Sequence, residues 1–456
     1  MRARGWLLVL LAGLGAGCAT YRPHPIDPGT TLERFESRRL DDPGLHAFLA
    51  ERSAGGARRW PLGVWDLDHL TLAAFYFLPD LDVMRARLQA AQAGIVTAGA
   101  RPNPDVGVVL RYNIDAAAFS PWTIPFTFDV PIETGGKREV RVIRAERLAD
   151  AARLGLAEAM WRARSRVRSA LVAHLLAGRD RDLLRDEERV RQEAVDVLER
   201  RLAVGDVSWP DVDAARTDLA TTRLSRRAAE GRTETTQVAL ASALGLPVGA
   251  LDGVVLSWPD LDTPPPPEAV APAAMQRAAL RNRLDLQRAL ADYAAADAAL
   301  KLEIAKQYPD VRLGPGYVFE EGDNKFQIGL SVRLPIFDRH EGPIAEATAR
   351  RREAGAQFLA RQAQVIREVD EGLRRYRSAL GQLTEASRAH ELLLAGEAAT
   401  RRALEAGEED RVTLVGVGVR RAVAARERLA ALREAQTALG ALEDAVERPV
   451  APGVAR

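Results

Sequence analysis

The sequence has 456 residues, almost no net charge and few aromatic residues. It contains 64 basic and 63 acidic side chains, which leave a formal net charge of +1 at pH 7. Without an overall positive field, the chain has no basis for binding nucleic acid, and we expect no nucleic-acid partner. Aromatic residues make up only 5% of the chain. The abundance of Ala, Leu, Arg and Glu is instead typical of long helices and coiled coils.

The N-terminus resembles a bacterial export signal. Two arginines precede an apolar stretch over residues 6–14, and small residues follow up to Cys18, the only cysteine. The apolar stretch is too short to span a membrane permanently. The residues from Gly15 to Cys18 resemble a lipobox, so we predict cleavage of a signal peptide at 1–17 and acylation of Cys18. The residue after the cysteine is Ala19, and not the Asp that holds lipoproteins at the inner membrane of enteric bacteria. The resemblance therefore implies sorting to the outer membrane. The alternative is an ordinary signal peptide with an incidental cysteine.

The rest of the chain is a duplication. Four short motifs recur at a slowly drifting offset: Leu78–Leu81 and Arg283–Leu286 (205 residues), Pro104–Val106 and Pro309–Val311 (205), Val130–Ile132 and Leu334–Ile336 (204), and Val204–Gly205 and Ala406–Gly407 (202). We therefore expect two repeats, at 65–258 and 273–447. The proline-rich segment 259–272 is predicted to be an extended, stiff linker without a helix. Residues 18–64 are expected to form an anchor and an irregular extension, and 448–456 a tail.

Each repeat contains two segments in which apolar residues alternate with other residues. The apolar positions are Val106, Val108, Leu110, Tyr112 and Ile114; Trp122, Ile124, Phe126, Phe128, Val130 and Ile132; Val311, Leu313, Tyr317 and Phe319; and Phe326, Ile328, Leu330, Val332 and Leu334. This pattern predicts four strands of about ten residues, a length suited to crossing a bilayer. A half-buried sheet of a soluble domain would show the same alternation.

The number of strands limits how they could cross a membrane. The mature chain has no run of 18 apolar residues, so a membrane-spanning part would have to consist of strands. A sheet in lipid must close on itself, and single-chain barrels need at least about eight strands. Four strands are too few, so several chains would have to share one barrel.

Long helices follow the strands in both repeats. From Lys137 to about Val204 no strong helix breaker occurs, which predicts a rod of roughly 100 Å. Three series of apolar residues at spacing seven predict coiled-coil seams: Leu176, Leu183, Val190, Val197 and Val204; Leu359, Ile366, Leu373 and Leu380; and Val369, Tyr376 and Leu383. His390 continues the last series and is interpreted as a polar core position. Gly205 and Gly407 predict two hairpin tips that point the same way.

These features together resemble the TolC-like outer-membrane efflux protein family, over nearly the whole mature chain. The specific motifs are the paired Pro-Asp-Val segments, Ser331–Asp338, and the Val-Gly turn followed by Asp211-Val212. The resemblance implies a mainly α fold with a small transmembrane β part. It also implies a homotrimer in outer-membrane lipid, with a shared 12-stranded β-barrel and a coiled-coil tunnel through the periplasm.

The resemblance further implies a passive channel of a tripartite efflux or type I secretion system, without a cofactor. A periplasmic adaptor, connected to an inner-membrane pump, would contact the hairpin tips at Leu202, Val204, Gly205, Leu404, Ala406 and Gly407. Drugs, metal ions and secreted proteins all stay open as substrates.

The tunnel entrance departs from the family pattern. The family has acidic residues after the second tip, at positions that here hold Thr413 and Gly416. The candidate acidic residues of the entrance are instead Asp211, Asp213, Glu408, Glu409 and Asp410. Our hypothesis is that Glu408, Glu409 and Asp410 form a ring that attracts cations, and the alternative is a solvated turn. Gly416 and Gly418 predict close packing or a bend, because helix-interior glycines cost roughly 1 kcal/mol each.

Two other classes of function fit the sequence less well than a channel does. An enzyme is disfavoured because the six histidines are scattered without metal-ligand spacing and no nucleophile-elbow or phosphate-loop motif occurs. We therefore expect no catalytic, cofactor or metal site. A periplasmic adaptor or scaffold lipoprotein without a channel would also combine coiled coil with β-structure. It would carry one helical hairpin between compact β-domains, whereas this chain repeats hairpin and strands twice.

Overall fold

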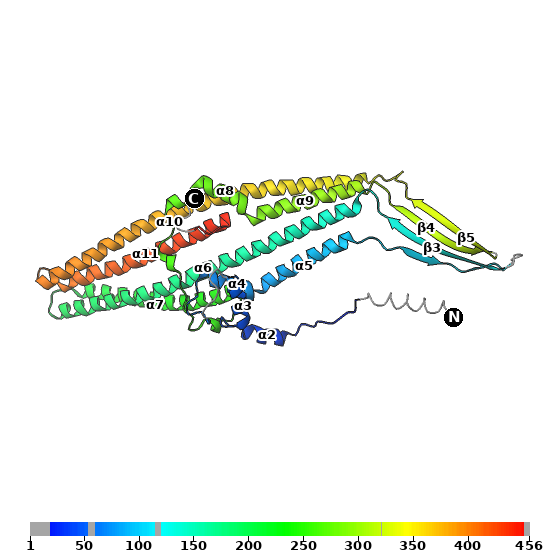
Figure 1. The fold of residues 1–456 in the computed structure, drawn as a ribbon. Helices are drawn as coiled ribbons and strands as arrows, with labels where there is room; N and C mark the ends of the chain where they lie inside the picture. The colour runs from blue at the N-terminus through cyan, green and yellow to red at the C-terminus, as the bar shows by residue number, and fades with distance from the viewer. Residues whose placement is uncertain (1–18, 53–59, 115–119, 321, 451–456) are drawn as a thin grey trace.

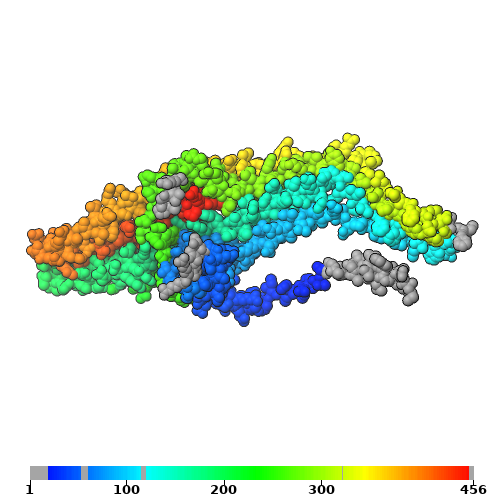
Figure 2. All heavy atoms as spheres, in the orientation of Figure 1, coloured from blue at the N-terminus to red at the C-terminus, as the bar shows by residue number. Residues whose placement is uncertain are grey.

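The computed structural model describes residues 19–52, 60–114, 120–320 and 322–450. The predicted signal peptide, its cleavage site and Cys18 lie outside the described residues. The molecule is long and narrow, with a sheet at one end and two helix hairpins at the other (Figure 1). A belt made of α2–α4, residues 245–271 and α8 crosses its middle, with α2–α4 at the lower edge and α8 at the upper edge of the view (Figure 2).

The order helix, strands, long helix, helix occurs twice. The first repeat contains α4 (Leu67–Phe77), α5 (Pro79–Gly99), β1 (Asp105–Val108), β2 (Arg111–Tyr112), β3 (Trp122–Ile132), α6 (Lys137–Ala203) and α7 (Trp209–Leu244). The second contains α8 (Pro272–Asn282), α9 (Leu284–Ala305), β4 (Val311–Glu320), β5 (Asp323–Val332), α10 (Glu341–Ala406) and α11 (Arg411–Val446). The mainly helical fold with a small sheet is confirmed.

The N-terminal extension is more ordered than the sequence indicated. It contains α2 (Pro28–Glu36) and α3 (Pro43–Arg52). The carboxylate of Asp27 accepts a hydrogen bond from the Thr30 backbone N–H and so caps α2. Leu45 and Leu49, one helical turn apart on α3, are fully buried in the same core cluster as α4. The prediction of an irregular extension was therefore wrong, because short caps and one apolar pair suffice to fix two helices.

The proline-rich linker packs onto the helices. It forms no α-helix before Pro272, but short 3-10 helices occur at η2 (Pro259–Asp262) and η3 (Pro267–Ala269), so the prediction of a linker without a helix was wrong. Another 3-10 helix precedes the linker at η1 (Val248–Leu251). Leu261 and Val270 are buried at 1% and 0% exposure. The expectation of an extended linker was therefore wrong, because these two side chains insert into the main core.

The sheet is antiparallel with the order β1-β3-β4-β5, and β2 also pairs with β3. The predicted first strand is divided into β1 and β2. β1 and β2 pair with β3 in the same register, which places the intervening Val109 opposite Pro125. Pro125 has no backbone N–H, so one hydrogen bond between the strands is missing there. Val109 N–H still donates to Pro125 O at 3.2 Å. β5 ends at Val332, short of the predicted Leu334, because its register would place Leu334 opposite Pro309.

The heptad seams are formed mainly in the half of the molecule that carries the tips. Leu176, Val190 and Val197 of α6 are buried, as are Val369, Tyr376, Leu383, Leu373 and Leu380 of α10. Leu359 and Ile366, however, are 63% and 37% exposed, so their place in the seam was wrong. The partner helix α11 ends at Val446, and from there toward the sheet α10 packs on α9 instead. Leu359 and Ile366 lie in this second part of α10 and do not face α9.

Arginines join helices that meet end to end. The Arg38 guanidinium donates to Phe77 O at 2.9 Å and to Gly245 O at 2.8 Å, where α7 ends beside α4 and α5. In the second repeat, Arg283 donates to Asp444 O and Ala445 O at 3.3 Å each, where α11 ends beside α9. Helix C-termini leave carbonyl groups unpaired and attract positive charge. Each arginine therefore closes one joint.

Both long helices begin at a left-handed residue, which gives a matched pair of predictions. Gly136 before α6 has φ of 69°, and His340 before α10 has φ of 65°. A left-handed conformation costs a non-glycine residue about 1–2 kcal/mol. We expect Gly136→Ala to destabilise the protein by about 1 kcal/mol and His340→Gly to stabilise it by a similar amount. Apparent Tm values of purified protein would test this, and equal shifts of both variants in one direction would contradict it.

Candidate functional site

The two hairpins end together at the end of the molecule farthest from the sheet (Figure 1). The first turn lies between α6 and α7, and the second lies between α10 and α11. Gly205 and Gly407 have φ of 82° and 77°, which is the left-handed region in which glycine ends a helix. The predictions of turns at these two glycines and of a common direction are confirmed.

The six residues proposed for adaptor contact differ in exposure. Leu202 and Leu404 are half-buried, whereas Val204, Ala406 and both turn glycines are exposed. Val204 is 72% exposed, so its assignment to the heptad seam was wrong. α6 ends one residue before Val204, and the chain has already begun to turn there. The exposed residues form the surface of the tips, and their contact with an adaptor stays a prediction.

Two of the five candidate acidic residues have local structural roles. Asp211 accepts hydrogen bonds from the Ser208 backbone N–H and hydroxyl and so completes a capping box at the start of α7. The Ser208 hydroxyl and N–H hold the pKa of Asp211 below its usual value. Asp410 caps α11 by accepting from Thr413 N–H at 2.7 Å, and this bond lowers the pKa of Asp410.

Asp213, Glu408 and Glu409 are exposed, and no hydrogen bond or ion pair to a described residue engages their carboxylates. The hypothesis of a cation-attracting ring is therefore limited to Glu408 and Glu409, because the carboxylate of Asp410 is engaged as the cap of α11. Whether these side chains line a tunnel stays a prediction.

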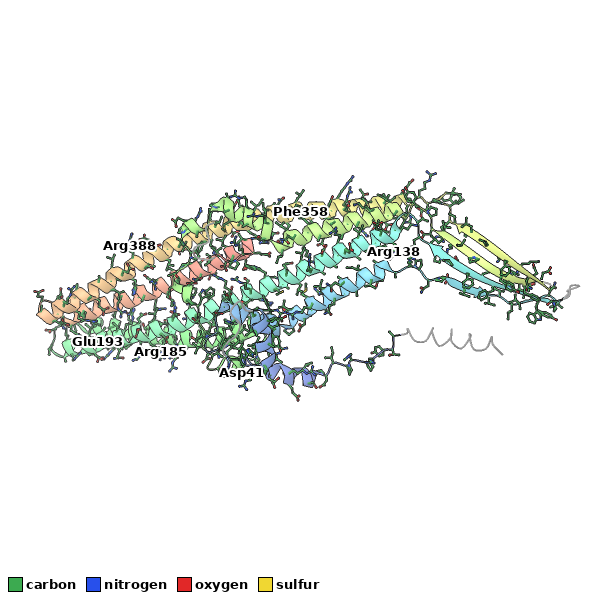
Figure 3. All side chains as sticks on the ribbon, viewed as in Figure 1. Asp41, Arg138, Arg185, Glu193, Phe358 and Arg388 are labelled. Atoms are coloured by element: carbon green, nitrogen blue, oxygen red, sulfur yellow. The ribbon has the colours of Figure 1, made fainter. Side chains whose placement is uncertain are left out.

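Ionic contacts join the first hairpin to the second near the tips. Arg201 on α6 lies 3.1 Å from the carboxylate of Asp410, and Arg411 on α11 contacts Glu193 on α6. Glu193 lies close to the tips (Figure 3). Val190 and Val197 of α6 pack with Val415 of α11 in the same region. Sequence reasoning missed these contacts, because each joins residues about 200 positions apart.

The two glycines of α11 have different surroundings. A side-chain carbon at Gly418 would lie 3.2 Å from Val190 Cγ1, so close packing against α6 explains this glycine. A carbon at Gly416 would meet no described atom within 4 Å. The packing explanation therefore holds for Gly418 and is wrong for Gly416 in the single chain.

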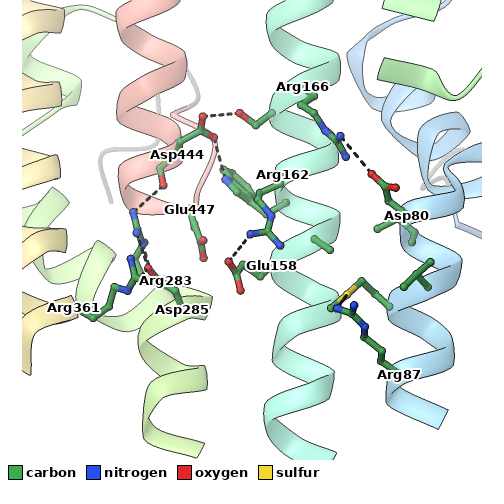
Figure 4. Close-up of a pocket in the computed structure, with 16 residues that line it drawn as sticks. Asp80, Arg87, Glu158, Arg162, Arg166, Arg283, Asp285, Arg361, Asp444 and Glu447 are labelled. Carbon is green, nitrogen blue, oxygen red and sulfur yellow. Dashed lines mark hydrogen bonds and ion pairs between the residues drawn. The ribbon is translucent and has the colours of Figure 1, made fainter. Parts of the chain in front are cut away.

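A cleft of about 760 Å³ lies in the middle of the molecule, between α5, α6 and the joint of α11 with α9 (Figure 4). Trp161 Nε1 and Ser165 Oγ donate to the two carboxylate oxygens of Asp444, at 3.1 and 2.5 Å. Arg162 donates to Glu158 at 2.9 Å. The lining contains five arginines and five carboxylates. Because these charges balance, the cleft offers no net attraction to an ion of either sign.

One wall of this cleft is the joint closed by Arg283. Arg283 lies 2.7 Å from Asp285 and 2.8 Å from Glu368. Burial by itself would lower the pKa of Arg283, but the bond and charge of Asp285 leave it raised. Glu447 accepts from Leu284 N–H at 2.6 Å, and burial raises the pKa of its carboxyl group. These contacts hold the ends of α9 and α11 together.

No metal-binding cluster of His, Cys, Asp or Glu occurs in the described parts of the chain. Among the described helices, none is long and apolar enough to cross a membrane.

His390 gives a pH-dependent prediction for the second hairpin. It is half-buried after Leu383 on the α10 seam, and its Nδ1 is buried without a hydrogen-bond partner in the described structure. Burial lowers the pKa of His390, and the charges of Arg428 and Arg421 lower it further, against Glu391. The unfolded chain, with a His pKa near 6.5, therefore takes up the proton more readily than the folded chain. The stability tied to a neutral His390 is complete above about pH 6.5 and is lost as pH falls.

We expect the apparent Tm of the wild type to fall more between about pH 7.5 and pH 5.5 than that of His390→Leu. A Tm difference between the two proteins that does not change with pH would contradict this prediction.

Residues 78–246 match the model of a family described as outer membrane efflux protein. The match spans the first repeat from α5 to the end of α7. The prediction from the sequence is thereby confirmed, as is the function of an outer-membrane channel of tripartite efflux systems. The family is one of transport channels rather than enzymes.

Relatives of this efflux protein include the cobalt-zinc-cadmium resistance protein CzcC of Cupriavidus metallidurans. The two are 27% identical over 300 residues, which cover 64% of this chain and 68% of CzcC. Among solved structures, the outer membrane protein VceC of Vibrio cholerae has a TM-score of 0.65 at 20% identity, covering 84% of this chain and 97% of VceC. The CmeC outer membrane channel of Campylobacter jejuni has a TM-score of 0.63 at 15% identity, covering 83% and 85%. These structural likenesses show the fold.

Proposed function

We propose that three copies of this efflux protein form one channel, with a shared barrel in the outer membrane and a helical tunnel in the periplasm. The observation that supports this most is the sheet, which is open at both edges and strongly apolar on its surface. Phe326, Ile328 and Leu330 of β5 are 86%, 82% and 70% exposed. An open sheet edge in lipid leaves backbone groups unsatisfied, and the strands of one chain are too few to close.

The tips are proposed as the docking site of a periplasmic adaptor, which connects the channel to an inner-membrane pump. Two features support this: both turns lie at the end opposite the sheet, and Val204, Ala406 and both turn glycines are exposed. The channel itself would conduct passively, and the pump would select the substrate. Cys18 is proposed as a lipid anchor, supported by its position after the apolar signal segment.

Fractionation and conductance test the channel. We expect heat-modifiable trimers in the outer-membrane fraction and ion conductance in planar bilayers. A monomeric protein in the soluble periplasmic pool would instead favour the adaptor or scaffold alternative. For the anchor, we expect metabolic labelling with a radioactive fatty acid to mark the wild type but not Cys18→Ser. Equal labelling of both would refute acylation at Cys18.

The name of the relative CzcC makes divalent metal cations the substrate class that we propose to test first. Deletion of the gene should lower the tolerated concentrations of Co²⁺, Zn²⁺ and Cd²⁺, and the wild-type gene should restore them. Sensitivity to organic drugs alone would point to a different pump. Glu408→Gln with Glu409→Gln should reduce the cation preference of the conductance while both caps stay intact. An unchanged preference would remove the ring hypothesis.

A further inference from the structure

The first repeat is joined to the second by an internal seam between β3 and β4. The two strands are antiparallel, and the register pairs Ile132 with Val311 and Val130 with Leu313. Farther along, Ile124 pairs with Phe319. This seam shows how a repeat-one edge and a repeat-two edge of this sequence fit together.

The duplication relates every strand to a counterpart with a fixed offset. β1 and β2 correspond to β4 with an offset of 205, and β3 corresponds to β5 with an offset of 204. The structure provides an independent check. Val106 pairs with Phe128, and shifting both by their offsets gives Val311 and Val332, which are also a pair. In the same way, the pair Tyr112 and Trp122 becomes the pair Tyr317 and Phe326.

The chain therefore carries both halves of a second seam, on opposite edges of its sheet. β5 is the counterpart of β3, β1 and β2 are the counterparts of β4, and each of these edges lacks a partner on its outer side within the described sheet. The two edges lie three strand spacings apart, roughly 14 Å, so they cannot meet within one chain. A second copy of the chain offers the matching edge. Because the two edges differ, the contact is head-to-tail and can close into a ring.

We infer that β5 of one copy, continued as far as Ile336, pairs with β1–β2 of the next, continued as far as Ile114, in a register copied from the internal seam. Each pair at the internal seam joins a β3 residue to a β4 residue. Adding 204 to the number of the β3 residue and subtracting 205 from that of the β4 residue gives the predicted pair between two copies. The predicted pairs are Ile336 with Val106, Leu334 with Val108, Leu330 with Tyr112, and Ile328 with Ile114. The inference rests on the proposed oligomeric channel and adds the residue contacts that hold it together.

The side chains fit this register. All four predicted pairs are apolar on both sides, and the exposed β5 residues among them would gain apolar neighbours. Ser331 would face Arg111, and Gly329 would face Asn113, on the other face of the sheet. If the register slipped by one residue, each apolar β5 side chain would pair with a residue whose side chain points to the other face of the sheet.

The helical junction next to the strands does not repeat. At the internal seam, Lys137 lies 2.6 Å from the carboxylate of Asp310 and donates to Tyr308 O. The same offsets replace Lys137 by Glu341 and Asp310 by Asp105, so two acidic residues take the place of the ion pair. The seam between copies therefore depends on strand pairing, and the strands are where it should be tested.

Disulfide cross-linking tests the register directly, because Cys18 is the only native cysteine. Paired strand residues lie within the Cα separation that a disulfide tolerates, whereas diagonal neighbours are about 7–8 Å apart. We expect full-length protein with Leu334→Cys and Val108→Cys to form covalent trimers on non-reducing gels. Leu334→Cys combined with Val106→Cys or with Leu110→Cys should cross-link only slightly, and each single variant should not cross-link.

The strongest cross-link in a displaced pair, or none in conducting trimers, would overturn the register while leaving the trimeric channel in place. Absence of trimers in the wild type would instead overturn the proposed function. If the first double variant fails to assemble, Leu330→Cys with Tyr112→Cys samples the same register elsewhere on the strands. Its cross-linking would support the proposal, and its failure in assembled trimers would overturn it.

Discussion

Replacing Glu443 by Ala should destabilise the folded chain by about 3–5 kcal/mol, because it leaves Arg168 buried without its charge partner. Arg168 of α6 is 3% exposed, and its Nε lies 2.9 Å from the carboxylate of Glu443 on α11. It also donates to the backbone O of Gln436 at 3.0 Å. Burial lowers the pKa of Arg168, against the charge of Glu443. Denaturant unfolding of detergent-solubilised protein measures the effect.

A second substitution at this pair separates a buried charge from lost packing. Arg168→Met with Glu443→Leu removes both charges and keeps the volume, so we expect it to be much closer to wild type than Glu443→Ala. Gly440 adds a steric test, since a side-chain carbon there would lie 2.4 Å from Arg168 Nη1. Gly440→Ala should therefore destabilise despite its better helix propensity. If the single charge deletion and the double variant cost the same, burial of an unpaired charge does not explain the loss.

Tyr376→Ala should cost about 3–5 kcal/mol, since it opens a cavity in the main core. Tyr376 of α10 is fully buried, and its hydroxyl donates to Pro265 O of the linker at 2.6 Å. Tyr376→Phe keeps the ring and removes only this hydrogen bond, and should cost about 1–3 kcal/mol because the carbonyl stays buried. The same unfolding measurement applies to both.

The linker contact also predicts where Tyr376→Phe acts first. Limited proteolysis should cut the segment 259–271 faster in Tyr376→Phe than in the wild type, while cleavage at the hairpin tips stays unchanged. The Gln436 side chain, which donates to Leu261 O at 2.7 Å, holds the same segment independently. Equal proteolysis of the linker in both proteins would show that the Tyr376 hydroxyl does not fasten it.

The features that the sequence predicted correctly are those written in local patterns. The lengths of α6 and α10 follow from the absence of breakers, and the tips follow from Gly205 and Gly407. The strands follow from alternation, and the offsets of 205 and 204 agree with the register of the sheet. Each of these depends on residues close together in the sequence, or on a comparison of the sequence with itself.

The features that it missed depend on side chains from distant segments. Nothing around Arg38 indicates that it reaches Gly245, and nothing around Arg201 indicates Asp410. The exposed Leu359 shows the opposite case, in which a regular pattern continues past the end of its partner helix. Of the candidate acidic residues, Asp211 belongs to the capping box of α7 and Asp410 caps α11, because a carboxylate near a helix start accepts hydrogen bonds from backbone N–H groups there.

The two arginine joints differ in when they can be completed during synthesis and export. Arg38 precedes its repeat, and its acceptors end at Gly245, so the first joint needs only the N-terminal half of the chain. The second joint waits for Asp444 and Ala445, close to the C-terminus. Because a chain that crosses a membrane emerges from its N-terminus, the first repeat can close while the second is still in transit. The first joint can therefore form before the second one, so the two ends of the belt become fixed in the order in which the chain is exported.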